Sequence, residues 1–246
     1  ALVAEQVRWV YDVRVVSSSE DGSMCVATSH SGGFTGEPEN VLRLWRVRDG
    51  RAELAARPNA DDGAEAAAPV HRRGVHALAT DRAGRLLVSA SDDAVATWAV
   101  DPASGSARAT QRTPSATAGV AESLLLLSDD RRLVVGGRVG ARIGLPVLDV
   151  TRGLVEVTRL QMRGDGAARL CELQLDGAPL VAAVTSNRAL LWDVRAPQTP
   201  SLRLPLASIQ GLASLGGGTT LVSASADAVY LHDLRRLPAD DPSVKK

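Results

Sequence analysis

Histidines and carboxylates are the residues in this chain that come nearest to a catalytic or metal-binding pattern. His71 precedes a short apolar run, and Asp92 and Asp93 follow in the next polar turn. Paired carboxylates act as general acid and base when they share a site, but neighbours in a tight turn point in different directions and lie in solvent. The chain has only four histidines, and none has a Cys, Asp or His at ligand spacing. These residues therefore predict neither a catalytic pair nor a metal centre.

Two glycine-rich stretches have the composition of a phosphate-binding loop but not its spacing. They run over residues 136–140 and 216–220, and neither contains GxGxxG or a P-loop lysine before a helix. Both are better interpreted as hairpin turns. The chain also lacks a GxSxG elbow, an HExxH motif, an EF-hand loop and an Asn-glycosylation sequence. We therefore expect a protein that is not an enzyme and that binds no cofactor or metal.

Composition indicates one large domain with no electrostatic preference for nucleic acid. The chain has 246 residues, of which 45% are hydrophobic, enough for a single domain with its own core. Its 28 Lys and Arg residues balance 28 Asp and Glu residues, so no positive field attracts phosphate backbones.

Cys25 and Cys171 lie far apart in apolar runs, which predicts buried thiols in a reducing compartment. Without a membrane-length apolar run or a leader pattern, we expect a soluble nucleocytoplasmic protein.

A short segment occurs twice and reveals an internal repeat. LVSASDDAV at residues 87–95 returns as LVSASADAV at residues 221–229. One third of the spacing between the two copies is about 45 residues, the length of one blade of a β-propeller. The repeat therefore predicts a propeller.

The strand that closes each repeat unit is visible five times. It lies at residues 41–45, 95–98, 145–149, 189–193 and 229–233. The aligned positions 45, 98, 148, 192 and 232 are unevenly spaced, which suits blades with surface loops of different length. A second β-rich run precedes these strands, as at residues 24–28, 132–135 and 180–184. Each such pair predicts a hairpin.

The apolar pattern of these strands favours a ring of blades over an open sandwich. The strands are apolar without clean alternation, which is typical of sheets covered on both faces. A blade cannot cover both of its faces alone, so a closed ring is the arrangement that buries them. We predict a single all-β propeller domain over residues 1–246, with blades at about 7–57, 70–113, 119–163, 167–206 and 209–237 and a tail at 238–246.

Five recognisable blades leave open whether they are part of a six- or seven-bladed ring. An open ring exposes unpaired strand edges, and the segment Ala1-Leu2-Val3-Ala4-Glu5 is a candidate for the outer strand of the last blade.

Two further stretches depart from the repeat. Residues 30–40 extend a hairpin connection, which makes them a candidate contact loop. Residues 58–69 are small, acidic and bounded by proline, as in a flexible connection between blades.

Polar residues of the second blade resemble those that many WD40 repeats join by hydrogen bonds. His71 lies ahead of one strand, Asp92 or Asp93 lies in the next turn, and Trp98 follows in the strand after it. The resemblance implies a WD40-type β-propeller, in which such a network rigidifies a blade by satisfying its buried polar groups. His71 is therefore expected to be structural.

The order of irregular features resembles one WD40 family, the small WD-repeat nucleoporin of the Y-shaped outer-ring complex of the nuclear pore. The features that carry this likeness are Arg8-Trp9, residues 26–29, the insertion ending at residues 37–40, and residues 42–47, 71–75, 86–91, 100–102 and 190–195. The resemblance implies an architectural propeller at the nuclear envelope, bound to other outer-ring nucleoporins in a hetero-oligomer. The family has seven blades where five are found here, and Leu148 stands where Trp is expected.

Three arginines are candidates for contacts with partner proteins. Arg72 and Arg73 lie in the connection that enters the second blade. A planar guanidinium pairs well with carboxylates at interfaces, and a solvated surface pair is the alternative. Trp192-Asp193-Val194-Arg195 resembles the WDxR sequence by which some propellers dock on the adaptor of cullin-type ubiquitin ligases, and only Arg195 adds information beyond the blade itself. A ligase substrate receptor is therefore an alternative function, and a generic trafficking or assembly scaffold is a third.

Overall fold

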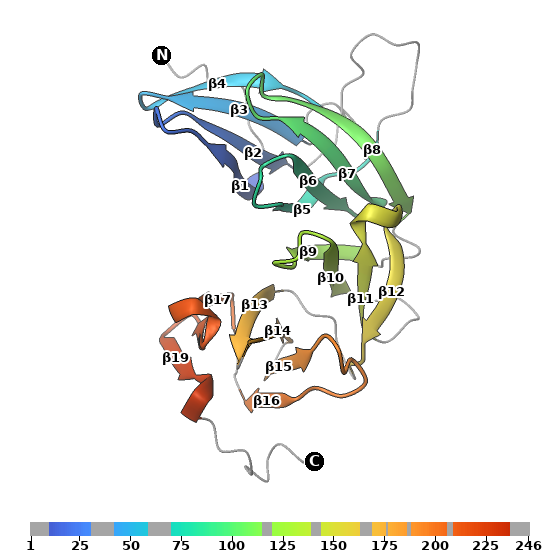
Figure 1. The fold of residues 1–246 in the computed structure, drawn as a ribbon, viewed down its shortest axis with the longest axis vertical. Helices are drawn as coiled ribbons and strands as arrows, with labels where there is room; N and C mark the ends of the chain where they lie inside the picture. The colour runs from blue at the N-terminus through green and yellow to red at the C-terminus, as the bar shows by residue number, and fades with distance from the viewer. Residues whose placement is uncertain are drawn as a thin grey trace.

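Five antiparallel sheets follow one another around the molecule as the blades of a β-propeller (Figure 1). This computed structural model describes residues 10–30, 42–58, 70–114, 120–138, 144–162, 169–175, 177–185, 188–205 and 209–236. Within these residues the regular structure is β-strand with a few short 3₁₀ turns. The predicted all-β propeller fold is confirmed.

The described strands form four sheets of four strands and one sheet of three, each ordered as along the chain. Blade 1 contains β1 (Val10–Ser18), β2 (Met24–His30), β3 (Leu42–Arg48) and β4 (Arg51–Ala56). Blade 2 contains β5 (Val75–Thr80), β6 (Leu86–Ser91), β7 (Ala94–Asp101) and β8 (Ser106–Pro114). Blade 3 contains β9 (Val120–Leu126), β10 (Arg132–Arg138), β11 (Leu145–Asp149), η2 (Val150–Arg152) and β12 (Val155–Leu160).

The last two blades follow the same outward order. Blade 4 contains β13 (Arg169–Leu175), β14 (Ala178–Val184), β15 (Arg188–Asp193) and β16 (Leu202–Pro205). Blade 5 contains β17 (Gly211–Leu215), η3 (Gly216–Gly218), β18 (Thr220–Ala224), β19 (Val229–Asp233) and η4 (Leu234–Arg236). The first strand of each blade lies beside the first strand of the next, so β1, β5, β9, β13 and β17 form the inside of the arc. Blade 5 has no outer strand among the described residues.

Buried apolar side chains fill the four boundaries between consecutive blades. Neighbouring residues of one strand serve opposite boundaries: Leu87 packs toward blade 1, and Val88 packs toward blade 3. This two-sided burial is the reason that the strands show no simple apolar and polar alternation. The hydrophobic effect therefore stabilises the blades mainly through their neighbours.

Two glycines in equivalent turns allow one blade to approach the next. Gly84 has a φ of +67°, and a Cβ there would lie 2.4 Å from the carbonyl oxygen of Val16 in blade 1. Gly218, at the equivalent position of blade 5, has a φ of +90°, and its Cβ would lie 2.5 Å from the amide nitrogen of Gln174 in blade 4. Both the backbone conformation and the close approach require glycine. The sequence repeat is therefore also a repeat of blade packing.

An aspartate closes the turn after the third strand in four of the blades. Its carboxylate accepts a hydrogen bond from the backbone amide two residues later, as in an Asx turn. The four aspartates are Asp101, Asp149, Asp193 and Asp233, with distances of 3.1, 2.9, 2.8 and 3.1 Å. In blades 2, 3 and 4 this turn leads into the outer strand.

The structure corrects one expectation about turns and leaves several segments outside the described residues. Gly136 and Gly137 lie within β10, at an irregularity in its pairing with β9, and not in a hairpin turn. Gly216–Gly218 does connect two paired strands, as predicted. Most of the candidate loops at 30–40 and 58–69, the segment 1–5 and the tail at 238–246 lie outside the described residues. None of the described helical segments is long and apolar enough to span a membrane.

Candidate interaction site

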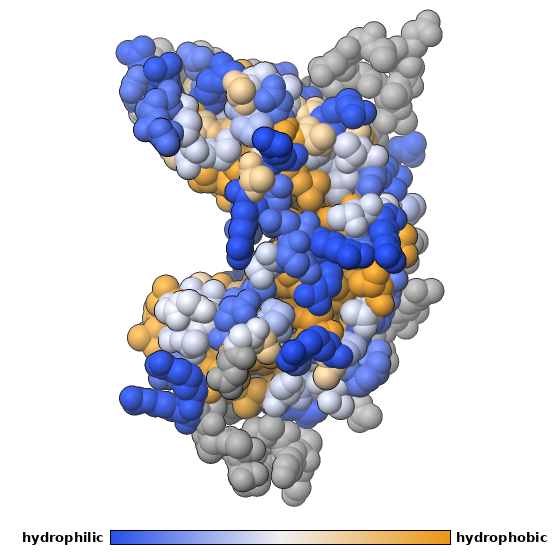
Figure 2. Space-filling model, viewed as in Figure 1, coloured by the Kyte–Doolittle hydropathy of each residue, from blue (hydrophilic) through white to orange (hydrophobic). Residues whose placement is uncertain are grey.

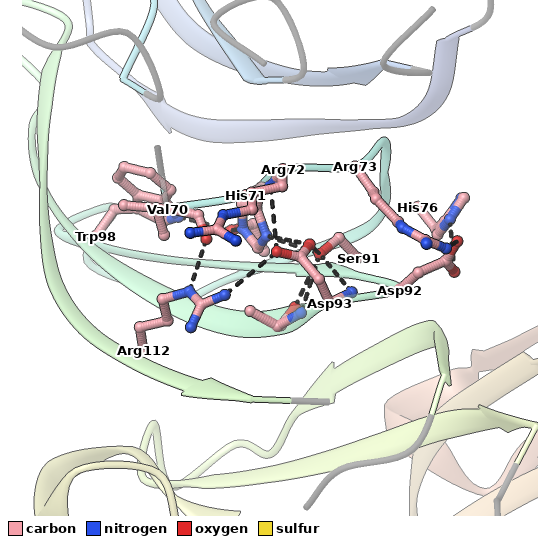
Figure 3. Close-up of polar contacts among 12 residues, drawn as sticks. Val70, His71, Arg72, Arg73, His76, Ser91, Asp92, Asp93, Trp98 and Arg112 are labelled. Atoms are coloured by element: carbon pink, nitrogen blue, oxygen red, sulfur yellow. Dashed lines mark hydrogen bonds and ion pairs between the residues drawn. The ribbon is translucent and has the colours of Figure 1, made fainter. Parts of the chain in front are cut away.

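Blade 2 contains a chain of buried polar side chains that runs from an indole to a carboxylate (Figure 3). Trp98 Nε1 donates to Ser89 Oγ at 2.7 Å, and Ser89 Oγ lies 2.6 Å from His71 Nε2. His71 Nδ1 lies 2.8 Å from Ser91 Oγ, which donates to Asp93 at 2.5 Å. Because an indole can only donate, the chain is satisfied throughout if Nδ1 of a neutral His71 carries the proton. The predicted His and Trp network is thus formed, and Asp93 is its carboxylate.

The protonation of His71 follows from its burial. Its side chain is fully buried, and burial together with the Arg112 charge lowers the pKa of His71 to about 4. The imidazole is therefore neutral near pH 7, in agreement with the single proton that the hydrogen-bond chain requires. A buried neutral imidazole whose two nitrogens are both bonded stabilises the blade and has no access to a substrate.

Asp93 differs from the expectation that both turn carboxylates lie in solvent. Its side chain is only 19% exposed, and it accepts from the Arg72 amide and from Arg112 Nη2, both at 3.2 Å. Burial favours a higher pKa for Asp93, but the hydrogen bonds from Ser91 and the Arg72 amide lower it overall. Asp92 points elsewhere and lies 3.1 Å from His76 Nε2. The prediction that the two carboxylates diverge is correct, whereas the prediction of solvent exposure is wrong for Asp93.

Other blades contain partial versions of this network. In blade 1, Trp45 Nε1 donates to Thr28 Oγ1 at 2.8 Å, and Thr28 lies 2.7 Å from His30 Nε2. In blade 5, Ser223 and His232 take the places of Ser89 and Trp98 and lie 3.1 Å apart. Apolar Val135 and Ala183 stand at the serine position in blades 3 and 4. In blade 4, Trp192 Nε1 instead donates to the Gln161 carbonyl.

Arg72 and Arg73 lie on the surface directly beside this buried network (Figure 3). The Arg72 backbone is fixed by Asp93, and Arg73 Nη1 lies 3.9 Å from Asp92 Oδ2. The exposed ring of Tyr11 in blade 1 lies next to His76, with ring centroids 4.8 Å apart. Arginine and tyrosine are enriched in residues that dominate protein interfaces. The structure thus combines a rigid blade end with exposed groups suited to partner contacts.

Arg195 does not belong to this surface. It lies in the turn after the third strand of blade 4, at the opposite end of the strands from Arg72 and Arg73. Its side chain is 67% exposed, and its guanidinium binds the Asp193 carboxylate with Nη2 2.6 Å from Oδ2 and Nε 2.9 Å from Oδ1. Arg235 makes the same fork with Asp233 in blade 5. The pairing lowers the pKa of Asp193 and raises that of Arg195. A local role in the turn therefore accounts for the geometry of Arg195.

A cavity of about 650 Å³ lies on the inside of the arc, where the first strands of the blades converge. Polar groups in this cavity, and Asp12 near it in sequence, join neighbouring blades. Arg14 Nε donates to the Leu78 carbonyl at 3.1 Å, and Asp12 accepts from the Leu78 amide at 2.9 Å. Glu172 accepts from the amide and the hydroxyl of Ser128 at 2.8 and 2.7 Å. These hydrogen bonds were not predicted, because they join residues of different blades. The sequence alone does not show that such residues lie close together in space.

Among the described residues, no cluster of three or more His, Cys, Asp or Glu side chains forms a metal site. Cys25 and Cys171 are buried thiols, and burial raises the pKa of Cys171 to about 12. No protein-family model matches the chain, and no curated protein matches it significantly.

Proposed function

We propose that this protein is a non-catalytic scaffold whose propeller holds other proteins. The observation that carries the proposal is the division of polar groups in blade 2. His71 and Asp93 make hydrogen bonds within the blade, whereas the side chains of Arg72 and Arg73 are exposed at its end. A rigid base with exposed guanidinium groups suits the recognition of carboxylates on a partner surface.

The likeness to the small WD-repeat nucleoporin leads us to place this scaffold in the outer ring of the nuclear pore. The tagged protein is expected at the nuclear rim, and outer-ring nucleoporins are expected among the main proteins that purify with it. A diffuse cytoplasmic signal without these nucleoporins would contradict the nuclear pore assignment and favour a trafficking or assembly scaffold.

A charge-reversal variant tests the proposed contact surface. Replacing Arg72 and Arg73 by glutamate should remove the main partners from the purified complex, because carboxylates on the partner then meet like charges. Arg236→Glu is the matched control, since Arg236 is an exposed arginine on the η4 turn of blade 5. Loss of the same partners from both variants, or from neither, would show that Arg72 and Arg73 form no specific contact.

The alternative function, a substrate receptor of a cullin-type ligase, depends on Arg195. Two arginines in equivalent turns provide a matched test. Arg195 and Arg235 each bind the carboxylate of the aspartate two residues before them, but only Asp193 follows a tryptophan. If the WDxR likeness is functional, Arg195→Ala removes the ligase adaptor from purified complexes and Arg235→Ala does not. Unchanged adaptor recovery with both variants would eliminate this alternative.

A further inference from the structure

A second cavity, of about 640 Å³, lies between blades 1 and 2, at the end of the strands opposite to Arg72 and Arg73. Its wall in blade 1 is formed mainly by the turn between β1 and β2. Its wall in blade 2 is formed by the turn between β5 and β6 and the turn between β7 and β8. Four serines of blade 1 line it, namely Ser17, Ser18, Ser19 and Ser23.

Ser18 differs from its neighbours because its hydroxyl has no hydrogen-bond partner among the described residues. Ser19 Oγ donates to the Ser23 carbonyl at 3.0 Å and lies 2.5 Å from Ser23 Oγ, so that it holds the turn together. At the position of blade 2 that matches Ser18, Thr80 donates to the Leu86 carbonyl at 3.0 Å. The match is fixed by the turns, since Ser18 and Thr80 each precede the residue whose carbonyl accepts from the turn glycine. The fold therefore gives the Ser18 hydroxyl no role in this turn.

Two carboxylates follow Ser18 in the same exposed turn. Glu20 and Asp21 lie two and three residues later, and residues 18–22 are all exposed. Figure 2 shows hydrophilic residues gathered at this end of blade 1, at the upper left of the view. Hydrogen bonds from the Ser19 hydroxyl and the Ser23 amide lower the pKa of Asp21, so this carboxylate is ionised near pH 7. An accessible serine followed by negative charges is complementary to an enzyme with a basic substrate groove.

Two arginines line the same cavity and supply positive charge. Arg46 Nη2 in β3 donates to the carbonyls of Ala103 and Ser104 in blade 2, at 3.1 and 2.8 Å, and is thereby held between the two blades. Arg85 of blade 2 is exposed and forms no ion pair with any described residue. Asp101 also lines the cavity, but its carboxylate accepts hydrogen bonds from Ser104 and the Ala103 amide. Guanidinium groups in this setting suit a phosphate, to which they donate charge-assisted hydrogen bonds.

We propose that Ser18 is a phosphorylation site and that Arg85 and Arg46 bind the phosphate at the boundary between blades 1 and 2. A protein kinase transfers the terminal phosphoryl group of ATP. A bond forms between phosphorus and Ser18 Oγ, the bond to the ADP oxygen breaks, and the hydroxyl proton passes to the catalytic carboxylate of the kinase. The new group carries about two negative charges at pH 7. Because the site lies away from Arg72 and Arg73, this inference is independent of the partner contacts proposed above.

Phosphorylation of the purified protein tests the site. The protein is incubated with ATP and a serine kinase that selects acidic sequences, and mass spectrometry locates the modified residue. Phosphate is expected at Ser18, and Ser18→Ala should abolish it. Ser106→Ala is the matched control and should leave the modification unchanged, since Ser106 is exposed but no carboxylate follows it in β8. An unmodified protein, or phosphate only at other serines, would overturn the proposal.

Protein that carries phosphoserine at position 18, incorporated during translation, tests the binding of the phosphate without a kinase. Its midpoint of thermal unfolding should exceed that of the unmodified protein, and the increase should shrink at high salt. Arg85→Ala should remove most of the increase. Arg82→Ala should preserve it, because Arg82 is an exposed arginine of the same turn that lines the other cavity. No increase, or an equal loss of it in both variants, would overturn the assignment of Arg85 as a phosphate ligand.

Discussion

Blade 2 and blade 5 contain nearly the same nine residues in different surroundings. In blade 2, β7 pairs with β6 and β8, and both faces of the sheet are buried. In blade 5, β19 pairs with β18 alone among the described strands, and Val229 and Leu231 face outwards. The sequence LVSAS therefore specifies a strand and its turn, while burial depends on what the neighbouring chain segments supply.

The polar network shows the same difference between the two blades. Ser89 lies between Trp98 and His71, whereas Ser223 contacts His232. The turn serine is retained in both, since Ser91 and Ser225 each donate to an aspartate two residues later. The hydrogen bond between the turn serine and its aspartate thus forms whether or not the blade is buried. The bonds among Trp98, Ser89 and His71 are found only in the buried blade 2. Substitutions at matched positions should separate these contributions.

Removal of the tryptophan should have the largest effect. Trp98→Ala creates a cavity in a fully buried position and should lower the free energy of unfolding by about 3–5 kcal/mol. His232→Ala, at the matched position of blade 5, should cost only about 1 kcal/mol, since it removes one hydrogen bond from a partly exposed strand. Urea unfolding of both variants measures the difference. Equal losses would mean that blade 5 is as well packed as blade 2.

Acid should weaken blade 2 through His71. Because the folded-state pKa of about 4 lies below the ordinary value of 6.5, the unfolded chain binds a proton first as the pH falls. Stability should therefore be constant above pH 6.5 and decrease between pH 6.5 and 4, by roughly 2–3 kcal/mol for this group. His30, with a pKa of about 4, acts in the same direction.

Urea unfolding as a function of pH measures this effect. His71→Gln should reduce the slope between pH 6.5 and 4 without removing it, because His30 remains. An unchanged slope would show that His71 is not a buried neutral group.

Alanine substitution of the turn glycines should reveal the close approach of blades. Gly84→Ala should destabilise the protein by about 1–3 kcal/mol, because a strained φ is combined with a clash against the Val16 carbonyl. Gly22→Ala is the control, since Gly22 has a similar φ of +79° but open space around its Cβ position. Thermal unfolding compares them. An equal loss of stability in both variants would mean that backbone strain alone causes the destabilisation and that the clash with Val16 contributes nothing.

The smallest effect on stability is expected at the exposed side chains of β19 in blade 5. Leu231→Thr introduces the residue found at the matched position 97 and should change the free energy of unfolding by less than about 0.5 kcal/mol, since the side chain is exposed. Chemical unfolding at low protein concentration measures it. A loss of several kcal/mol would show that Leu231 is covered within the single chain.

Much of the fold was predictable because repetition is a property of the chain itself. The spacing of the repeated segment and the five closing strands indicated the blades. The resemblance to WD40 repeats predicted a network of His71, Trp98 and one of the two turn carboxylates, and the structure identifies that carboxylate as Asp93. The strand position of Gly136 and the blade-joining roles of Arg14 and Glu172 were missed. Those features depend on pairing irregularity and on contacts between blades, which local sequence does not encode. Exposure of Arg72 and Arg73 was predicted, whereas the fork of Arg195 on Asp193 appeared only in the structure.

Hydrogen exchange of the two repeated segments distinguishes a strand enclosed in blade 2 from an exposed strand in blade 5. In dilute protein, amides of residues 95–98 should exchange slowly, because β7 is bonded on both sides within a buried sheet. Alternate amides of residues 229–232 should exchange rapidly, because β19 pairs with β18 alone among the described strands. Equal protection of both segments would contradict the conclusion that one repeat is enclosed and the other is open.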